Sequence, residues 1–92
     1  MSAEERIRAC RWLLNTILSA GPSGISRYEI AERWEHSSMT CISRHLSESV
    51  FHYLKNAAMD GWEVELASYK VGRVSMYYFA DEVAVRRKFH QF

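Results

Sequence analysis

Hydrophobic residues recur at every third or fourth position over about residues 3–20 and predict an amphipathic helix. Glu4 and Glu5 lie in its first turn, where the helix dipole favours anions. The helix is expected to end before the Gly-Pro-Ser-Gly run at 21–24, the strongest break in the chain. Its apolar stripe is wide, so we expect it to pack on two sides or to meet a second subunit. The stripe consists of Ile7, Cys10, Leu14, Ile17 and Leu18, widened by Trp12 and Leu13.

A second, shorter helix is predicted over about residues 26–35. Ile25 precedes it and is expected to form a short strand. Ser26 is a favourable N-cap, and Glu29 follows three residues later, which is the spacing of a capping box. The side chains expected to face inward are Ile30, Ala31 and Trp34.

Helical spacing of apolar residues returns over about residues 47–60, where Val50, Leu54 and Ala57 share one face. Gly61 is expected to end this helix, because glycine adopts the left-handed C-terminal conformation at low steric cost. With that face buried, the exposed positions are expected to be Glu48, Ser49, Phe51, His52, Lys55, Asn56 and Met59.

The segment between the second and third helices allows two arrangements. In one, Ser37 or Ser38 caps a single long helix that continues to Asp60. In the other, a separate turn or short helix occupies about residues 38–45, and Ser47 caps the third helix afresh. We favour the second arrangement, because serine is unfavourable inside a helix and favourable at its N-cap.

After Gly61 the apolar period shortens to two, which predicts an antiparallel hairpin over about residues 62–80. The turn is expected at Val71-Gly72-Arg73. Three aromatic residues, Tyr69, Tyr77 and Phe79, are expected to share one face of the hairpin. The alternating apolar positions are Trp62, Val64 and Leu66 on the first strand and Val74, Met76 and Tyr78 on the second.

Residues 81–92 are expected to form a short C-terminal helix or tail that Asp81 caps. Its apolar residues, Val83, Val85 and Phe89, are expected to pack on the body of the protein or on a second subunit. The densest positive cluster of the chain, Arg86-Arg87-Lys88, lies in the same segment.

The length of 92 residues limits the chain to one domain, and the formal net charge is +1. The two cysteines lie in different segments, and neither a signal peptide nor an apolar run of about 20 residues is present. The composition therefore predicts a cytoplasmic protein with reduced thiols and no membrane span.

Cysteine and histidine residues, which can bind metals or carry out catalysis, lie close together in one part of the sequence. Cys41 and His45 are four residues apart on a possible helix, with His36 and His52 nearby in sequence. A structural zinc site requires four ligands at close spacing, and this set has one thiol. Neither a phosphate-binding glycine loop nor an HExxH motif is present. We therefore expect no metal, no cofactor and no enzymatic activity.

The order of helix, glycine and hairpin with a basic tip resembles winged helix-turn-helix proteins. The run LSESVFHYLKNAAMDGWEV resembles the recognition helix and wing of MarR-like and ArsR-like regulators over about a third of the chain. SRYEIAERW resembles the first helix of a helix-turn-helix. The resemblance implies an α+β winged helix-turn-helix fold, with three to four helices, a two- to three-stranded antiparallel wing and a short C-terminal helix. Their loose pattern of Leu, Ser, Ser, Val, Leu and Gly falls here on Leu46, Ser47, Ser49, Val50, Leu54 and Gly61.

The resemblance also implies a non-catalytic transcriptional regulator, acting as a repressor that binds double-stranded DNA as a homodimer. The helix of residues 47–60 would enter the major groove, and the wing would contact the adjacent backbone or minor groove. The helix of residues 3–20 and the C-terminal segment would form the dimer contact. The candidate DNA-binding residues are Ser47, Ser49, His52, Lys55 and Asn56 on the helix, Lys70 and Arg73 on the wing, and Arg44, Arg86, Arg87 and Lys88 elsewhere.

The alternative is a winged-helix module that binds a protein instead of DNA, such as an inhibitor or adaptor of the size found in phages and plasmids. The small net charge favours it, as do acidic Glu63 and Glu65 and an exposed Phe51. A third possibility is an architectural DNA binder, which differs from a repressor in lacking sequence selectivity.

Overall fold

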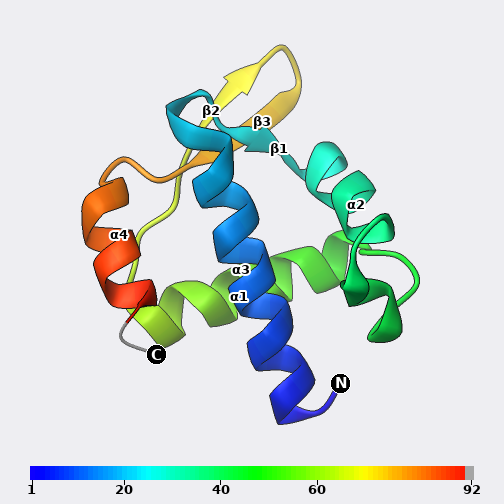
Figure 1. Cartoon of the computed structure of the whole chain (residues 1–92). Helices are drawn as coiled ribbons and strands as arrows, with labels where there is room; N and C mark the ends of the chain where they lie inside the picture. The colour runs from blue at the N-terminus through cyan, green and yellow to red at the C-terminus, as the bar shows by residue number, and fades with distance from the viewer. Residues whose placement is uncertain (91–92) are drawn as a thin grey trace.

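The computed structural model describes residues 1–90 and has an α+β fold (Figure 1). In the view of Figure 1, α1 crosses in front of α3, and α2 and α4 lie on opposite sides of this pair. The hairpin of β2 and β3 lies at the top, next to the end of α1. The elements are α1 (Ala3–Ala20), η1 (Gly21–Ser23), β1 (Ile25–Ser26), α2 (Arg27–Glu35), η2 (Ser38–Cys41), α3 (Glu48–Trp62), β2 (Ala67–Val71), β3 (Val74–Tyr78) and α4 (Glu82–Phe89).

The core lies where α1 packs against α3. Ser2 caps α1 through a full capping box, in which its Oγ accepts from the Glu5 N–H at 3.1 Å and Glu5 Oε1 accepts from the Ser2 N–H at 2.9 Å. The hydrogen bonds from Ser2 lower the pKa of the Glu5 carboxyl. Ile7 was expected in the buried stripe but is 48% exposed, because the first turns of α1 extend beyond α3 (Figure 1). The stripe residues that are buried are Cys10, Leu13, Leu14, Ile17 and Leu18.

The α2 helix has the predicted N-cap, since Ser26 Oγ accepts from the Glu29 N–H at 3.2 Å. The carboxylate of Glu29 pairs with Arg33 Nη2 at 3.2 Å, one turn along the helix. Ile30 and Trp34 are fully buried, as predicted for the inward face. The Trp34 ring meets Trp12 of α1 edge-on, with 5.2 Å between ring centroids.

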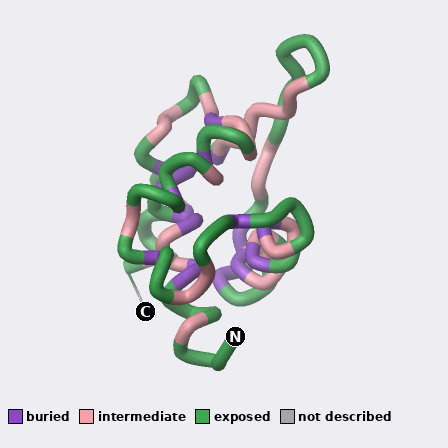
Figure 2. The backbone as a smooth tube through the Cα atoms, turned by 90° about the vertical axis from the view of Figure 1, so that its right-hand side faces the viewer, coloured by how far each residue is buried: buried purple, intermediate pink, exposed green. Residues whose placement is uncertain are grey.

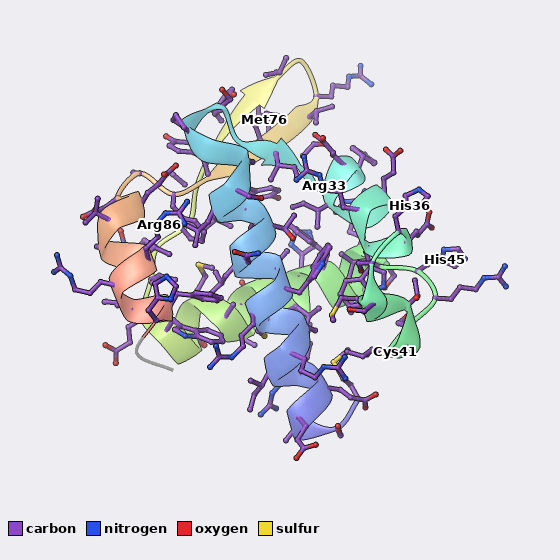
Figure 3. The ribbon with its side chains drawn as sticks, in the orientation of Figure 1. Arg33, His36, Cys41, His45, Met76 and Arg86 are labelled. Atoms are coloured by element: carbon purple, nitrogen blue, oxygen red, sulfur yellow. The ribbon has the colours of Figure 1, made fainter. Side chains whose placement is uncertain are left out.

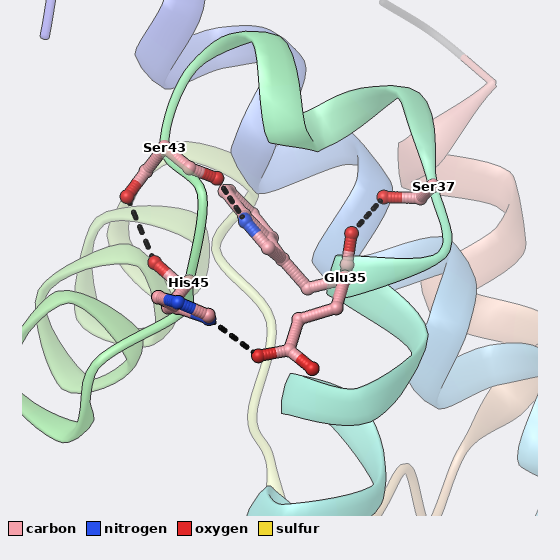
Figure 4. A network of polar contacts seen from close by, with 5 residues as sticks. Glu35, Ser37, Ser43 and His45 are labelled. Carbon is pink, nitrogen blue, oxygen red and sulfur yellow. Dashed lines mark hydrogen bonds and ion pairs between the residues drawn. The ribbon is translucent and has the colours of Figure 1, made fainter.

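The connection from α2 to α3 follows the favoured arrangement. A short 3₁₀ turn, η2, is followed by a new N-cap at Ser47, whose Oγ accepts from the Val50 N–H at 3.2 Å. Two contacts hold the connection to α2 (Figure 4). The buried Trp34 indole donates to the Ser43 carbonyl at 2.7 Å, and Glu35 Oε1 lies 2.5 Å from His45 Nδ1.

The buried face of α3 differs from the predicted face by one position. Phe51 was expected to be exposed but has no exposed surface, because its ring packs on Tyr77 of β3 with 5.4 Å between centroids. Val50 and Ala57, expected inside, are half-buried. The hairpin covers the side of α3 that carries Phe51, and this contact rotates the buried face. The buried residues of α3 are Phe51, Leu54, Ala58 and Trp62.

The end of α3 also corrects the sequence prediction. The helix continues through Gly61 to Trp62, and Glu63 adopts the left-handed conformation with φ 53°. Trp62 therefore belongs to the helix, and β2 begins only at Ala67. The Trp62 ring is 9% exposed and packs beside Phe89 of α4 with 6.2 Å between centroids, so tertiary packing extends the helix past the glycine.

The sheet has the strand order β1-β3-β2, and both pairs are antiparallel. The predicted first strand is present, with Ile25 opposite Tyr77. Gly24, at φ 79°, lies so close to β3 that an added Cβ would stand 2.9 Å from the Tyr77 carbonyl oxygen. The tight turn joins Val71 to Val74 as predicted, with Gly72 at φ 64°.

The aromatic residues of the hairpin do not form the predicted set. Tyr69 faces Tyr78, with 5.8 Å between ring centroids, whereas Tyr77 contacts Phe51 of α3. Neighbouring residues of a strand point to opposite faces, so Tyr77 and Tyr78 separate. Phe79 follows the strand and is buried in the core.

The C-terminal segment forms a helix, α4, which Asp81 caps by accepting from the Ala84 N–H at 3.1 Å. Val85 is buried, but Val83 is 69% exposed, contrary to expectation, because residues two apart lie on different faces of a helix. Lys88 Nζ donates to the Glu63 carbonyl at 2.6 Å and fixes α4 to the end of α3. Within residues 1–90, no helix has the length and apolar character that crossing a bilayer requires.

Candidate nucleic-acid interface

A polar recess of about 280 Å³ opens where the first turns of α2 and α3 meet the hairpin. Arg27 and Tyr28 form one wall from α2, and Glu48 and His52 form a second wall from α3. Arg73 and the first residues of β3 complete the border. The lining residues are Arg27, Tyr28, Glu48, His52, Arg73, Val74, Ser75 and Tyr77.

One carboxylate lies among the cationic groups of this recess. Glu48 Oε2 is 3.9 Å from Arg27 Nη2, and its Oε1 is 3.8 Å from His52 Nε2. The Arg27 guanidinium also lies over the Tyr28 ring, 4.5 Å from its centroid. The recess therefore combines two guanidinium groups and an imidazole with a single acidic side chain.

The N-terminal ends of two helices lie at the same place. Ser26 caps α2 immediately before Arg27, and Ser47 caps α3 immediately before Glu48. Ser49 Oγ lies 3.3 Å from Ser47 Oγ, so both hydroxyls are at the exposed start of α3. The unpaired N–H groups and dipole of a helix N-terminus favour an anion, which adds to the attraction of the guanidinium groups.

Two of the predicted cations lie on the hairpin. Lys70 and Arg73 are exposed on either side of Gly72, and Figure 2 shows this turn projecting from the body of the protein. Lys55 of α3 is half-buried, and its Nζ lies 5.5 Å from the Tyr77 ring centroid. The hairpin and the adjacent flank of α3 thus carry positive charge toward the recess.

The remaining predicted residues lie elsewhere. Asn56 borders a separate depression together with Arg6 and Tyr53. Arg44 is exposed in the connection before α3. Figure 3 shows Arg86 on α4, on the opposite side of the molecule from His45. Of the eleven predicted residues, His52 and Arg73 line the recess. Ser47 and Ser49 flank its lining residue Glu48, Lys55 lies over its lining residue Tyr77, and Lys70 pairs with its lining residue Ser75. The other five, Arg44, Asn56, Arg86, Arg87 and Lys88, do not line it.

Sequence reasoning missed Arg27 and Tyr28. A usable signal was present, since a basic residue in the first turn of a helix opposes the helix dipole and is unfavourable there unless an anion compensates it. Arg27 stands directly after the predicted N-cap Ser26, and in the structure Glu48 supplies that compensation.

The residues considered for a metal site are dispersed. Within residues 1–90, no group of three or more His, Cys, Asp or Glu side chains is close enough to hold a metal ion. His36, Cys41 and His45 lie apart in Figure 3, and Cys41 Sγ accepts from Arg8 Nη2 at 3.8 Å. Cys10 is buried, which raises the pKa of its thiol.

Comparisons of this chain with models of known protein families, with curated proteins and with solved structures found no match. Function is therefore inferred from the chain's own geometry. The recess can bind an anion through Arg27, Arg73 and two helix N-termini. The adjacent exposed side of α3 can offer hydrogen bonds through Ser49.

Proposed function

We propose that this protein is a winged helix-turn-helix domain that binds double-stranded DNA and regulates transcription as a repressor, without catalysis. The observation that carries the proposal is that Arg27 of α2 and Arg73 of the hairpin turn border one recess at the start of α3. These three elements come from distant parts of the chain. The order of helix, connection, helix and hairpin supports the same class of protein.

In the proposed complex, the exposed side of α3 enters the major groove, which is wide enough for an α-helix. Ser49 and Asn56 are exposed there and can contact base edges. Arg27, Lys70 and Arg73 contact backbone phosphates, which position the helix but do not specify sequence. The hairpin turn then follows the backbone next to the groove.

The charge distribution predicts weak nonspecific binding. Glu48 and Asp60 stand near the two ends of the exposed side of α3, and the net charge of the chain is +1. Because the net positive charge is small, we expect the electrostatic part of the affinity to be small. Base contacts and DNA shape must supply a correspondingly larger share of the affinity.

A homodimer is the proposed functional unit, because a twofold DNA site requires one. The apolar side chains of α1 that motivated this expectation are mostly buried in the chain's own core. Ile7 of α1 and Val83 of α4 remain exposed. Sedimentation equilibrium over a range of concentrations tests the dimer, and the variant Val83→Ser should weaken association through α4.

The rival function is a protein-binding module. Tyr28 and Tyr53 are 62% and 50% exposed, and exposed tyrosines are frequent anchors of protein interfaces. Stable co-purification with one protein, combined with indifference to DNA, would support this rival.

Fluorescence anisotropy with a labelled duplex from the protein's own upstream region tests DNA binding. We expect binding at low salt, and about tenfold or greater weakening in the Arg27→Gln/Arg73→Gln variant. A plot of log affinity against log salt concentration has a negative slope. In the variant this slope should become shallower by about two, one for each lost phosphate contact.

Arg86→Gln/Arg87→Gln is the matched control, because it also removes two positive charges, from exposed positions of α4. The control should bind nearly as well as the wild type. Absence of binding at low salt, or equal weakening by the control, contradicts the proposed interface. Equal affinity for random and upstream duplexes would instead indicate an architectural DNA binder.

A further inference from the structure

A second depression, away from the recess, lies between the first half of α1 and the last turns of α3. Its volume is about 330 Å³, within the range of small-molecule sites. Most of its surface is apolar, including Ile7, which the fold leaves 48% exposed, and the edge of Trp62. We call it the α1–α3 groove, and its lining residues are Arg6, Ile7, Cys10, Arg11, Ala57, Gly61 and Trp62.

Two guanidinium groups border this apolar surface. Arg11 is held in place by two rings, with its Cζ 5.8 Å from the centroids of both Trp62 and Phe89. Arg6 and Tyr53 border the same neighbouring depression, and the Tyr53 side chain raises the pKa of Arg6. Among the described residues, none that lines the groove is acidic. A pair of cations beside an apolar wall favours a ligand that is both anionic and apolar.

Gly61 supplies an independent observation. It lies inside α3 with an ordinary helical backbone, where glycine destabilises a helix by about 0.5–1 kcal/mol relative to alanine. An added Cβ would meet no atom within 4 Å, so packing within the chain does not require glycine here. Gly61 lines the groove, and the absence of a side chain keeps that wall open. The open space at Gly61 leaves room for a ligand against this part of α3.

We propose that the α1–α3 groove binds a small organic acid, with its carboxylate between Arg6 and Arg11 and its apolar body against Ile7, Ala57 and Trp62. At about 30 Å³ for each non-hydrogen atom, the volume accepts a molecule of roughly ten such atoms. The proposal does not depend on DNA binding, because the groove shares no lining residue with the recess.

The groove also contacts the exposed side of α3. Arg6 and Tyr53 both border the neighbouring depression that contains Asn56, and the Tyr53 side chain influences the pKa of Arg6. A carboxylate that recruits Arg6 competes with the Tyr53 hydroxyl for the same guanidinium. Ligand binding is therefore expected to change the environment of Tyr53.

Titration of the ¹⁵N-labelled protein with octanoate, followed by two-dimensional amide NMR, tests the site. Octanoate has the charge and size that the groove accepts, and 1-octanol has the same chain without the charge. We expect saturable shifts confined to the groove residues and Tyr53 with octanoate. With 1-octanol we expect affinity at least tenfold weaker.

Three variants make the test specific. Arg6→Gln/Arg11→Gln should weaken octanoate binding at least tenfold, whereas Arg8→Gln, on the same helix but outside the groove, should leave it unchanged. Gly61→Leu should fold, because its Cβ has open space, and should also lose binding. Non-saturating or dispersed shifts, equal binding of 1-octanol, or equal weakening by Arg8→Gln would overturn the proposal.

Discussion

The first turn of α3 borders a polar recess with charged groups from α2 and the hairpin, whereas its last turns border an apolar groove beneath α1. The first turn is fixed by a local hydrogen bond, from the Val50 N–H to Ser47 Oγ. The last turn is fixed by distant packing, because Trp62 meets Phe89 of α4. A helix start that depends on a neighbouring residue can be predicted from sequence, and a helix end that depends on tertiary contacts cannot.

The largest expected change in stability concerns the middle of α3, between these two ends. Phe51→Ala should lower the free energy of unfolding by about 3–5 kcal/mol, because it empties a fully buried site under the hairpin. Urea denaturation followed by circular dichroism measures the change. The control Val50→Ala, at a half-buried neighbour, should cost far less. A loss below about 1 kcal/mol for Phe51→Ala would mean that the ring is exposed.

Removing the helix start should have a smaller effect. Ser47→Ala is expected to cost about 1 kcal/mol, because the Val50 N–H loses its acceptor. Ser49→Ala should change stability by less than about 0.5 kcal/mol, since Ser49 is two residues after Ser47, inside the first turn, and is not the N-cap. Thermal unfolding of both variants separates them, and equal effects would show that Ser47 is not the cap.

At the other end of α3, the test is whether a substitution raises or lowers the stability of the protein. Gly61→Ala should stabilise the protein by about 0.5–1 kcal/mol, because Gly61 is helical and has open space around its Cβ. Glu63→Gly should also stabilise, because Glu63 holds the left-handed position. Urea denaturation measures the change. A loss of stability in Gly61→Ala would indicate that the helix ends at Gly61, as the sequence predicts.

The smallest expected effect concerns the recess. In the proposed complex, Glu48 would compete with a DNA phosphate for Arg27, so Glu48→Gln should tighten DNA binding about threefold at low salt, an effect the size of an exposed ion pair. Asp60→Asn removes the same charge near the other end of α3 and should change affinity less. Anisotropy titrations compare the two, and equal gains would show a general charge effect.

Much of the fold could be predicted because its signals are local. Ser26 and Ser47 mark helix starts, the Gly-Pro-Ser-Gly run ends α1, and Gly72 marks the turn. The errors arise where distant segments meet. The hairpin decides that Phe51 is buried and Val50 is not, although both are apolar and adjacent.

The candidate site was predicted in part for the same reason. His52 and Arg73 could be proposed from the sequence because each lies on an element with a strong pattern. Arg27 was missed, because its proximity to Glu48 depends on the angle between α2 and α3. Asn56 is on the exposed side of α3 with Ser49, but it borders the depression beside Tyr53 and not the recess.

The hydrogen bond from Trp34 to the Ser43 carbonyl has a consequence for association kinetics. It is partly buried and, with the exposed contact between Glu35 and His45, ties the segment before α3 to α2 in the folded protein. The spacing between the starts of α2 and α3 is then already set when a partner arrives. A partner that contacts both therefore meets a preorganised surface, so little ordering entropy is lost on docking and no slow rearrangement limits the encounter rate.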